Sequence, residues 1–321
     1  MFEKVLLFAC FGTALCLGCS RKTTTAFSSQ NLKIAYNILE DRDNGDYEVY
    51  AMNLDGSEKT NVSRHPDVAW TYNAWKDRLF FISDRDTCKR CYFLYETDIH
   101  GKQVRKMAEL QLEDSWMDSR NNGRELILTG RVGKKIRSQL FLLDAATGAF
   151  RQITADTTAL YSDPCFSPDG KQIVYRYKKN RRDRYEKAEL WLMNTDGSGT
   201  PQQLTHYPTS DTTAKWHDYH AGPPHWNAQA GYITYQSIQA GKYSIYAVTP
   251  DGKQQFKLAD FPLEAGWHDW SPDGEWLVMD MFDHEQTQFD IWLWNRKTKV
   301  LKQLTDTETF EQSPVFLLDK H

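Results

Sequence analysis

Four histidines with aromatic neighbours are the residues of this sequence whose types and spacing most clearly suggest chemistry. Two tetrapeptides share one pattern, Trp216-His217-Asp218-Tyr219 and Trp267-His268-Asp269-Trp270, and His220 and His225 lie between them. Converging imidazole nitrogens can bind a divalent metal, and a bound metal can acidify a substrate proton or activate water. We therefore predict a metal site formed by His217, His220, His225 and His268. The alternative is that these histidines are hydrogen-bonded side chains of the interior.

Basic side chains gather on consecutive polar loops between strands. The candidate binding residues on two of these loops are Lys134, Lys135, Lys178, Lys179, Arg181, Arg182 and Arg184. Two loops of the same kind elsewhere in the chain are acidic and contain Glu40, Asp41, Asp43, Asp46, Asp280, Asp283 and Glu285. A surface divided in this way can steer and orient an acidic protein or an anionic glycan. The alternative is that the charges only keep exposed loops hydrated.

The cysteines in the body of the chain suggest export. Cys88 and Cys91 form a lone CxxC pair, and no second ligand pair is present that would indicate a zinc site. In an oxidising compartment this spacing favours a local disulfide that pins a hairpin. Cys165 lies among apolar residues, so we expect a buried free thiol there.

The N-terminal segment has the features of an export signal. Lys4 precedes an apolar run over residues 5–17, which is too short to cross a membrane comfortably as a helix. Gly18-Cys19 resembles the lipobox of bacterial lipoproteins, which implies that residues 1–18 are a signal peptide and that Cys19 carries lipid. The alternative is a signal peptide that is cleaved without lipidation.

A polar tether is predicted over residues 19–30, between the lipidated cysteine and the folded domain. Ser20 directly follows the cysteine. By resemblance to the enterobacterial sorting rule, this residue implies a protein of the outer membrane that faces the periplasm.

The body of the chain is a repeat of short strands. Related turns fall near Gly56, Gly101, Gly148, Gly197, Gly252 and Thr298. Their spacing of about 45 to 55 residues is the period of a β-propeller blade. One unit predicts four antiparallel strands, at residues 163–167, 172–177, 189–194 and 203–205, from alternating apolar residues and turns that contain glycine. The register is open over residues 208–231, where either Trp216–Tyr219 or Pro224–Asn227 can be the innermost strand.

Six turns predict six blades, but the first blade lacks its innermost strand. The missing strand is predicted at the other end of the chain, where Ser313–Phe316 matches Asp163–Phe166. This pairing closes the ring and removes the open sheet edges that favour aggregation. The sequence therefore predicts an all-β, six-bladed β-propeller of four-stranded antiparallel blades over residues 31–318, closed by the C-terminal strand that completes the N-terminal blade.

These repeats resemble the TolB-type six-bladed propeller repeat. The resemblance rests on the turns at Ser167–Lys171 and Ser271–Glu275 and on hairpins such as Leu192–Thr205, and it covers nearly the whole chain after residue 30. It implies the fold, whereas related propellers differ in function: they serve as envelope scaffolds, gate prolyl-oligopeptidase-like proteases or form oligogalacturonate lyases. We expect neither the N-terminal α/β domain of TolB nor a hydrolase domain, since no GxSxG motif occurs.

We expect a non-catalytic binding or scaffold protein. Its binding face would carry the B–C hairpins, which join the second and third strands of each blade, and its partner would be an envelope protein or an anionic glycan. The alternative is a metal-dependent lyase similar to oligogalacturonate lyases, or a hydrolase, which acts on an anionic glycan in the channel. A divalent metal is the only cofactor considered. We expect a monomer that contacts the membrane only through its lipid, with no nucleic-acid partner.

Overall fold

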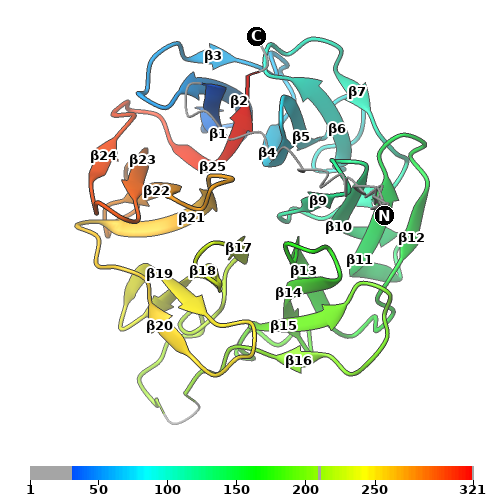
Figure 1. The fold of residues 1–321 in the computed structure, drawn as a ribbon. Coiled ribbons are helices and arrows are strands. Elements are labelled where there is room, and N and C mark those ends of the chain that lie inside the picture. The colour runs from blue at the N-terminus through cyan, green and yellow to red at the C-terminus, as the bar shows by residue number, and fades with distance from the viewer. Residues whose placement is uncertain (1–30, 209–210, 320–321) are drawn as a thin grey trace, which may run out of the picture.

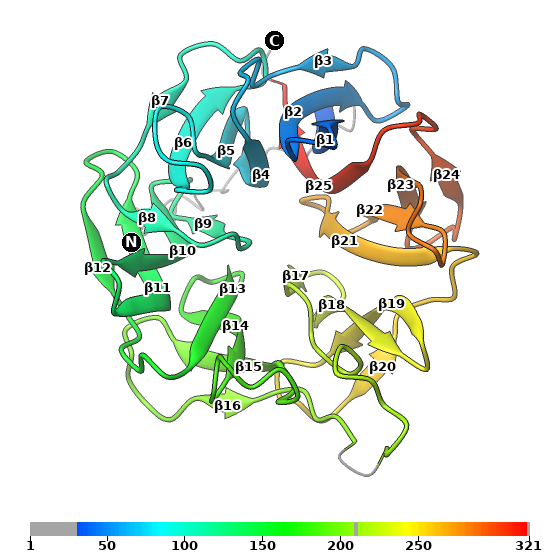
Figure 2. The same cartoon turned by 180° about the vertical axis from the view of Figure 1, so that it is seen from behind.

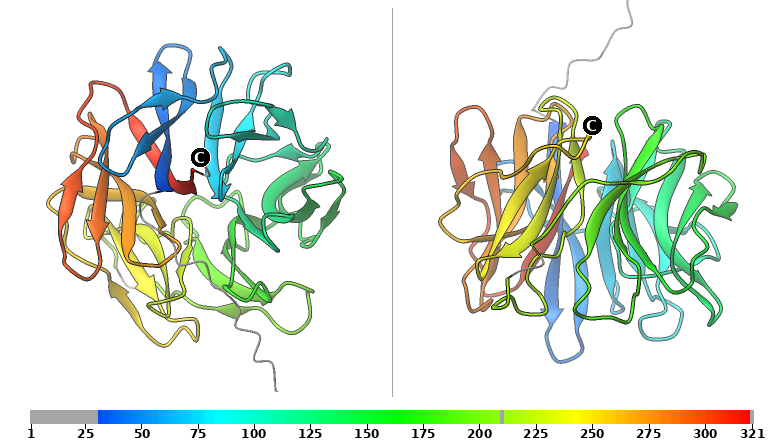
Figure 3. Two further views of the ribbon diagram at one scale, coloured as in Figure 1. Left: turned by 45° about the horizontal axis from the view of Figure 1, so that its top comes forward. Right: turned by 90° about the horizontal axis from the view of Figure 1, so that it is seen from below.

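Six antiparallel sheets surround a central axis in the computed structural model, which describes residues 31–208 and 211–319 (Figures 1 and 2). In each blade the strands are named A to D from the axis outward. Figure 3 shows the blades from the side, with their strands running between the two faces of the ring. The predicted all-β, six-bladed propeller is confirmed.

The first three blades occupy one half of the ring. Blade 1 contains β25 (Glu311–Leu318), β1 (Leu32–Asp41), β2 (Asp46–Asn53) and β3 (Thr60–Asn61); blade 2 contains β4 (Ala69–Trp75), β5 (Arg78–Ser83), β6 (Phe93–Asp98) and β7 (Arg105–Lys106); blade 3 contains β8 (Gln111–Leu112), β9 (Asp118–Arg120), β10 (Glu125–Val132), β11 (Ile136–Asp144) and β12 (Phe150–Gln152).

The other three blades complete the ring. Blade 4 contains β13 (Leu160–Phe166), β14 (Gln172–Lys178), β15 (Glu189–Asn194) and β16 (Gln202–Gln203); blade 5 contains β17 (His225–Asn227), β18 (Tyr232–Gln239), β19 (Lys242–Val248) and β20 (Gln255–Lys257); blade 6 contains β21 (Glu264–Trp270), β22 (Trp276–Phe282), β23 (Phe289–Asn295) and β24 (Leu301–Gln303).

The hydrophobic core lies between the blades. One cluster joins Val174 and Leu190 of blade 4 to Ile233 of blade 5, and another joins Ile245 of blade 5 to Met279 of blade 6. Strand alternation places apolar side chains on both faces of each sheet, so each blade packs against two neighbours and buries apolar area on both sides. The repeat therefore folds as a ring rather than as independent sheets.

The ring closes through β25, which pairs antiparallel with β1 from Leu32↔Leu318 to Ile38↔Glu311. The last strand described is thus the strand A of the blade that contains the first, as predicted (Figure 1). β1 is thereby paired on both sides, by β25 and by β2.

Strand A is irregular where it lines the axis. In blade 3 it is divided into β8 and β9, which pair with different parts of β10. In blades 4 and 6 the register shifts between Ser162 and Cys165 and between Ala265 and His268. Bulges of this kind redirect side chains, so the axis receives polar groups that a regular strand would point into the sheet interface.

The open register over residues 208–231 is resolved in favour of the second candidate. His225–Asn227 forms β17, and Trp216–Tyr219 lies in a turn of the preceding insertion. The predicted signal peptide (residues 1–18), lipidated Cys19 and tether (residues 19–30) lie outside the described residues. Within the described ranges, no helix is long and apolar enough to cross a bilayer.

Candidate functional site

The four predicted metal ligands separate into two pairs. His225 begins β17 and His268 lies in β21, and their ring centroids are 4.8 Å apart at the axis. His217 and His220 lie in the insertion between blades 4 and 5. Among the residues described here, no three His, Cys, Asp or Glu side chains are grouped so as to hold a metal ion. The structure therefore brings together two of the four histidines and keeps the other two apart from them.

His268 is buried and makes two side-chain hydrogen bonds, and His225 lies largely buried beside it. His268 Nε2 lies 2.9 Å from Thr234 Oγ1, and its Nδ1 lies 3.3 Å from the carbonyl oxygen of Gly266. Burial lowers the pKa of His268 to about 4. Burial and the neighbouring His268 also hold the pKa of His225 well below its usual range. Both imidazoles are therefore neutral near pH 7.

His220 connects the insertion between blades 4 and 5 to blade 4, and we call this contact the latch. Its Nδ1 accepts a hydrogen bond from the backbone N–H of Ala188 at 3.0 Å, so its Nε2 carries the hydrogen and donates to the carbonyl of Trp216 at 2.8 Å. Burial lowers the pKa of His220 to about 4, which preserves this neutral tautomer. His217 packs edge-on against Trp216, with ring centroids 5.2 Å apart.

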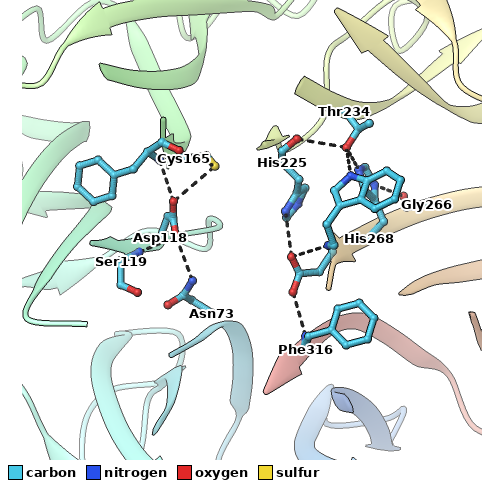
Figure 4. A network of polar contacts seen from close by, with 12 residues as sticks. Asn73, Asp118, Ser119, Cys165, His225, Thr234, Gly266, His268 and Phe316 are labelled. Atoms are coloured by element: carbon cyan, nitrogen blue, oxygen red, sulfur yellow. Dashed lines mark hydrogen bonds and ion pairs between the residues drawn. The ribbon is translucent and has the colours of Figure 1, made fainter. Parts of the chain in front are cut away.

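Two carboxylates near the axis join neighbouring blades (Figure 4). Asp118 Oδ2 accepts the backbone N–H of Phe166 in the next blade at 2.8 Å. Asp269 Oδ2 in the same way accepts the N–H of Phe316 at 2.9 Å, across the closure of the ring. Asp269 Oδ1 also lies 3.8 Å from His225 Nδ1. Each carboxylate thus aligns the strands A of two blades.

Burial shifts the ionisation of this network toward neutral forms. Desolvation raises the pKa of Asp118 to about 6 and that of Asp269 to about 7, and the charge of Asp118 contributes to the second shift. The same desolvation, with the nearby Asp118 charge, raises the pKa of the Cys165 thiol, whose Sγ donates to Asp118 Oδ2 at 3.5 Å. Cys165 is a free cysteine, as expected, but it lies within a polar network.

An aromatic collar crosses the channel, formed by Trp70, Tyr72, Trp116, His225, His268 and Trp267. Five ring pairs of this set have centroids 4.5 to 5.9 Å apart, and Trp267 and His268 are adjacent in the chain. Two contacts, Trp70 with Trp267 and Trp116 with His225, join blades that are not neighbours and therefore span the axis. The collar obstructs the channel at the level of strand A.

A cavity of about 570 Å³ lies on one side of the collar. The A–B turns around Asn121, Pro168, Gln229 and Pro272 surround it, and Trp116, Asp118, Cys165, His225 and Asp269 form part of its wall. We expected ligands on the face that carries the B–C hairpins. This cavity opens on the opposite face, where the A–B turns border its mouth, and the expectation for the hairpin face stays a prediction.

The predicted basic residues lie on the other side of the ring and form what we call the basic hairpin face, with two exposed aromatics. Lys134 and Lys135 lie in the turn between β10 and β11, and the others lie in or beside the hairpin between β14 and β15: Lys178, Lys179, Arg181, Arg182, Arg184, Tyr185 and Trp216. The Arg184 guanidinium lies 5.4 Å from the Tyr185 ring centroid and 4.8 Å from that of Trp216. Tyr185 is 68% exposed and Trp216 is 48% exposed.

Two further sequence assignments have clear positions. Cys88 and Cys91 are joined by a disulfide in the loop between β5 and β6, with Cα atoms 5.2 Å apart. Asp280, expected on an exposed acidic loop, is instead fully buried in β22, where it accepts the backbone N–H groups of Trp267 and Ser313. The reason is that strand β22 extends to Phe282, so the hairpin tip begins later than predicted.

Sequence reasoning did not identify Asp118 or Trp116, although it singled out His225 and Cys165 of the same cavity wall. Asp118 belongs to the degenerate third repeat, where the divided strand A hides the match to Asp269. The sequence nevertheless carried a signal. Asp118 stands two places before Arg120 and Asp269 stands two places before Ser271, so each carboxylate comes shortly before an A–B turn. Only the ring shows that the two carboxylates face one cavity.

Comparisons with known proteins give partial sequence matches. No protein-family model matches the chain. Dipeptidyl-peptidase 5 from Porphyromonas endodontalis is 31% identical over 113 residues, which are 35% of this chain and 15% of that protein. The peptidase YuxL from Bacillus subtilis is 26% identical over 151 residues, which are 43% of this chain and 21% of that protein. The matches therefore cover only a small part of each relative's length.

Solved structures match over most of the chain. A protein from Agrobacterium tumefaciens described as TolB has a TM-score of 0.63 and 17% identity, covering 88% of this chain and 91% of its own. TolB from Acinetobacter baumannii has a TM-score of 0.67 and 14% identity, covering 88% and 66%. An oligogalacturonate lyase from Vibrio parahaemolyticus has a TM-score of 0.53 and 15% identity, covering 82% and 72%. At these identities the likeness concerns the fold: this chain has the TolB-type six-bladed β-propeller fold.

Proposed function

We propose that this protein is a non-catalytic binding propeller of the bacterial cell envelope, which holds an acidic protein partner on its basic hairpin face. The observation that carries the proposal is the exposed stack of Tyr185, Arg184 and Trp216. Aromatic and arginine side chains dominate the binding energy of protein interfaces, and here both kinds stand together at the surface.

The surroundings of the stack support this role. His220 holds the carbonyl of Trp216, and Lys187 Nζ donates to the carbonyl of Asp218 at 2.8 Å, so the insertion is tied to the hairpin of blade 4. A fixed stack loses little conformational entropy when a partner covers it. The surrounding lysines and arginines attract an acidic surface over the range of the screened Coulomb interaction, about 8 Å at physiological salt.

The envelope location is part of the same proposal. It is supported by the export-signal features of residues 1–18, the lipobox resemblance at Cys19 and the TolB-type fold. Residues 19–30 would connect a lipid-anchored Cys19 to the ring, with the outer membrane as the proposed site. A protein partner is preferred to a glycan because exposed arginine and aromatic side chains stand together, as they do at the centres of protein interfaces.

The lyase alternative depended on convergence of four histidines. In the described structure only His225 and His268 meet, and both are engaged by hydrogen bonds or a neighbouring carboxylate. No observation favours that alternative, and we do not propose it.

The experiment is a pull-down from an envelope extract with the mature protein as bait, followed by salt titration. Reversal of charge at Lys178, Lys179, Arg181 and Arg182 is expected to remove the specific partner, and Trp216→Ala is expected to weaken its retention at least tenfold. The matched control reverses four exposed lysines of A–B and C–D turns, Lys102, Lys171, Lys253 and Lys299. An unchanged set of partners in both hairpin variants contradicts the proposal.

A separate test addresses the anchor. Cells grown with labelled palmitate should incorporate label into the protein, and Cys19→Ala should abolish incorporation while the precursor keeps its signal segment. Labelling that persists in the Cys19→Ala variant contradicts lipidation at this residue and leaves the binding proposal to its own test.

A further inference from the structure

We propose that the basic hairpin face also binds a second copy of this chain, so that the protein forms a two-fold dimer, hairpin face to hairpin face, when no other partner occupies it. In this dimer the acidic hairpins of each copy cover the basic hairpin face of the other. The inference rests on the proposed function, because it takes the basic hairpin face to be a binding surface. It departs from the monomer expected from the sequence.

The first observation is the placement of charge around the ring. In a ring of six blades, blade 1 lies opposite blade 4 and blade 6 lies opposite blade 3 (Figure 1). Blades 3 and 4 carry the basic hairpin face, whereas the same side of blades 6 and 1 is acidic, and we call that region the acidic sector. Its exposed carboxylates stand on two B–C hairpins and on the connection from β24 to β25: Glu40, Asp43, Glu285, Asp306 and Glu308.

The second observation is that neither group of charges is neutralised within the chain. Over residues 31–208 and 211–319, no ion pair joins a carboxylate of the acidic sector to a cation, and none joins an exposed cation of the basic hairpin face to a carboxylate. Exposed charges elsewhere do form such pairs, as Lys106 does with Glu109. Both regions therefore present charge that is free for another molecule. The exposed cations are Lys134, Lys135, Lys179, Arg182 and Arg184.

The opposite charges within each region are engaged locally. Arg42 of the acidic sector lies over an aromatic ring, 4.1 Å from its centroid, and His284 pairs with the buried Glu264. On the basic side, Asp183 Oδ1 accepts a backbone N–H group of its own hairpin at 2.9 Å. Each region thus presents mainly one sign of charge to solvent.

One two-fold axis satisfies both regions of both copies. The axis lies parallel to the two hairpin faces and crosses blades 2 and 5. Half a turn about it places blade 1 of one copy over blade 3 of the other, and blade 6 over blade 4. The acidic sector then meets the basic hairpin face twice, as in an isologous interface. Another acidic protein would leave the acidic sector of this chain unpaired, so the charges favour a second copy.

The exposed aromatic stack lies within this contact. Tyr185 and Trp216 belong to blade 4 and the insertion beside it, so the acidic hairpin of blade 6 from the other copy would cover them. Blades 2 and 5 lie on the axis and face their own copies. There Lys89 Nζ contacts the carbonyl oxygen of Asn44 at 3.4 Å, which directs this cation toward the acidic sector of its own chain. Such an interface depends on charge, so salt should weaken it.

The test begins with sedimentation velocity of the mature protein at low and high ionic strength. We expect a dimer at low ionic strength, and at least tenfold weaker self-association in high salt. A protein that stays monomeric at low ionic strength and submillimolar concentration overturns the proposal. Self-association that salt does not change overturns it as well.

Charge exchange then locates the interface. An acid-reversed and a base-reversed variant should each self-associate at least tenfold more weakly than the wild type. The variant that combines all ten changes should dimerise again, and an equimolar mixture of the two single variants should form a heterodimer. If neither restores association, the two-fold contact is wrong. The acid-reversed variant carries Glu40→Lys, Asp43→Lys, Glu285→Lys, Asp306→Lys and Glu308→Lys, and the base-reversed variant carries Lys134→Glu, Lys135→Glu, Lys179→Glu, Arg182→Glu and Arg184→Glu.

The matched control is the variant reversed at Lys102, Lys171, Lys253 and Lys299, whose changes lie on the opposite face of the ring. It should dimerise as the wild type does, and an equal loss in this control would overturn the assignment to the hairpin face.

Failure of the dimer is distinguishable from failure of the proposed function. The acid-reversed variant keeps its basic hairpin face, so it should still retain the acidic partner in the pull-down although it no longer dimerises. A monomeric wild type that retains this partner overturns the dimer alone. A wild type that dimerises as described but retains no partner contradicts the proposed partner alone.

Discussion

At the scale of single residues, the blades are aligned by side chains that bond to the backbone of a neighbour. Asn37 accepts the N–H of Thr71 at 2.7 Å and donates to the carbonyl of the same residue, whereas Asp280 accepts two N–H groups, from Trp267 and Ser313. The Asn37 amide is neutral and supplies both a hydrogen-bond donor and an acceptor. The Asp280 carboxyl group can gain or lose a proton, so its hydrogen bonds are linked to pH. Desolvation raises the pKa of Asp280 to about 7.

Asp280 makes stability depend on pH in a defined direction. The pKa of Asp280 is higher in the folded state than in the unfolded state. Its contribution to the free energy of unfolding is therefore complete below the unfolded pKa near 3.8 and is lost as the pH rises to about 7. Asn cannot ionise, so we expect Asp280→Asn to be less stable than the wild type at pH 4, with a deficit that shrinks toward pH 7.5. Urea unfolding across this range measures the difference.

An exposed acid provides the control for that experiment. Side-chain hydrogen bonding from Thr287 lowers the pKa of Asp283. Its stabilising effect is therefore present above about pH 3.8 and is lost as the pH falls below it. Asp283→Asn should show a deficit that grows as the pH rises from acid, which is the opposite sign. If the loss of stability in Asp280→Asn does not change between pH 4 and pH 7.5, the raised pKa of Asp280 in the folded protein is contradicted.

The latch at His220 is testable through one amide. Replacement by Ala removes the acceptor for the N–H of Ala188, so hydrogen exchange at Ala188 should accelerate at least tenfold at pH 7. His217→Ala is the control, because His217 contacts the Trp216 ring and does not bond to Ala188. Equal acceleration in both variants would show that loosening of the insertion, and not the latch, controls this amide.

At the scale of elements, C–D turns of several blades lie against the blade before them. A Cβ added to Gly56 would lie 2.6 Å from the carbonyl oxygen of Leu304 in blade 6. A Cβ added to Gly101 would clash with the carbonyl oxygen of Val62 in blade 1. Each glycine has a positive φ, of 89° and 71°. The repeated glycine that revealed the period thus serves two purposes, the turn and the close approach of the next blade.

Gly101→Ala should therefore cost more than turn strain alone. Gly197 occupies the same turn in blade 4, with φ of 79°, but no atom of a neighbouring blade lies within 4 Å of the position that a Cβ would take there. We expect Gly197→Ala to destabilise by about 1–2 kcal/mol, the cost of a left-handed backbone, and Gly101→Ala by about 1–3 kcal/mol more, as for overpacking. Chemical denaturation of both variants measures the difference, and equal losses would contradict docking by Gly101.

At the scale of the whole molecule, stability depends on one strand pairing that joins the two ends of the sequence. β25 supplies buried Val315 and Phe316 to two different inter-blade clusters and pairs with β1 along its length. A chain that stops after Phe310 should lose cooperative unfolding, because blades 1 and 6 would then expose apolar faces and an unpaired edge. Calorimetry measures this, and a synthetic peptide of residues 311–318 should restore the transition. A cooperative transition in the truncated chain at the wild-type temperature would contradict closure by β25.

Much of this architecture was predictable because its signals are local and recurrent. Alternation within strands, turns of the Ser-Pro-Asp-Gly kind and the period of about 45 to 55 residues predict blades. The match of Ser313–Phe316 to Asp163–Phe166 predicts ring closure. Cys88 and Cys91 are close in sequence, so their approach needs no knowledge of the tertiary structure. The sequence left the register open at the insertion before β17 and did not predict the divided strand A of blade 3, since the repeat is interrupted at both places.

The sequence by itself determined the fold class, the number of blades, the closing strand and the basic character of the hairpins in blades 3 and 4. Only the tertiary structure decided which side chains share a space. Trp116 and His225 are far apart in the sequence yet meet across the axis with centroids 4.5 Å apart, while His217 and His268, in matching tetrapeptides, lie apart. The physical reason is that strand periodicity specifies a face of one sheet, whereas the axial site depends on bulges, on the tilt of six blades and on the aromatic side chains that fill the channel.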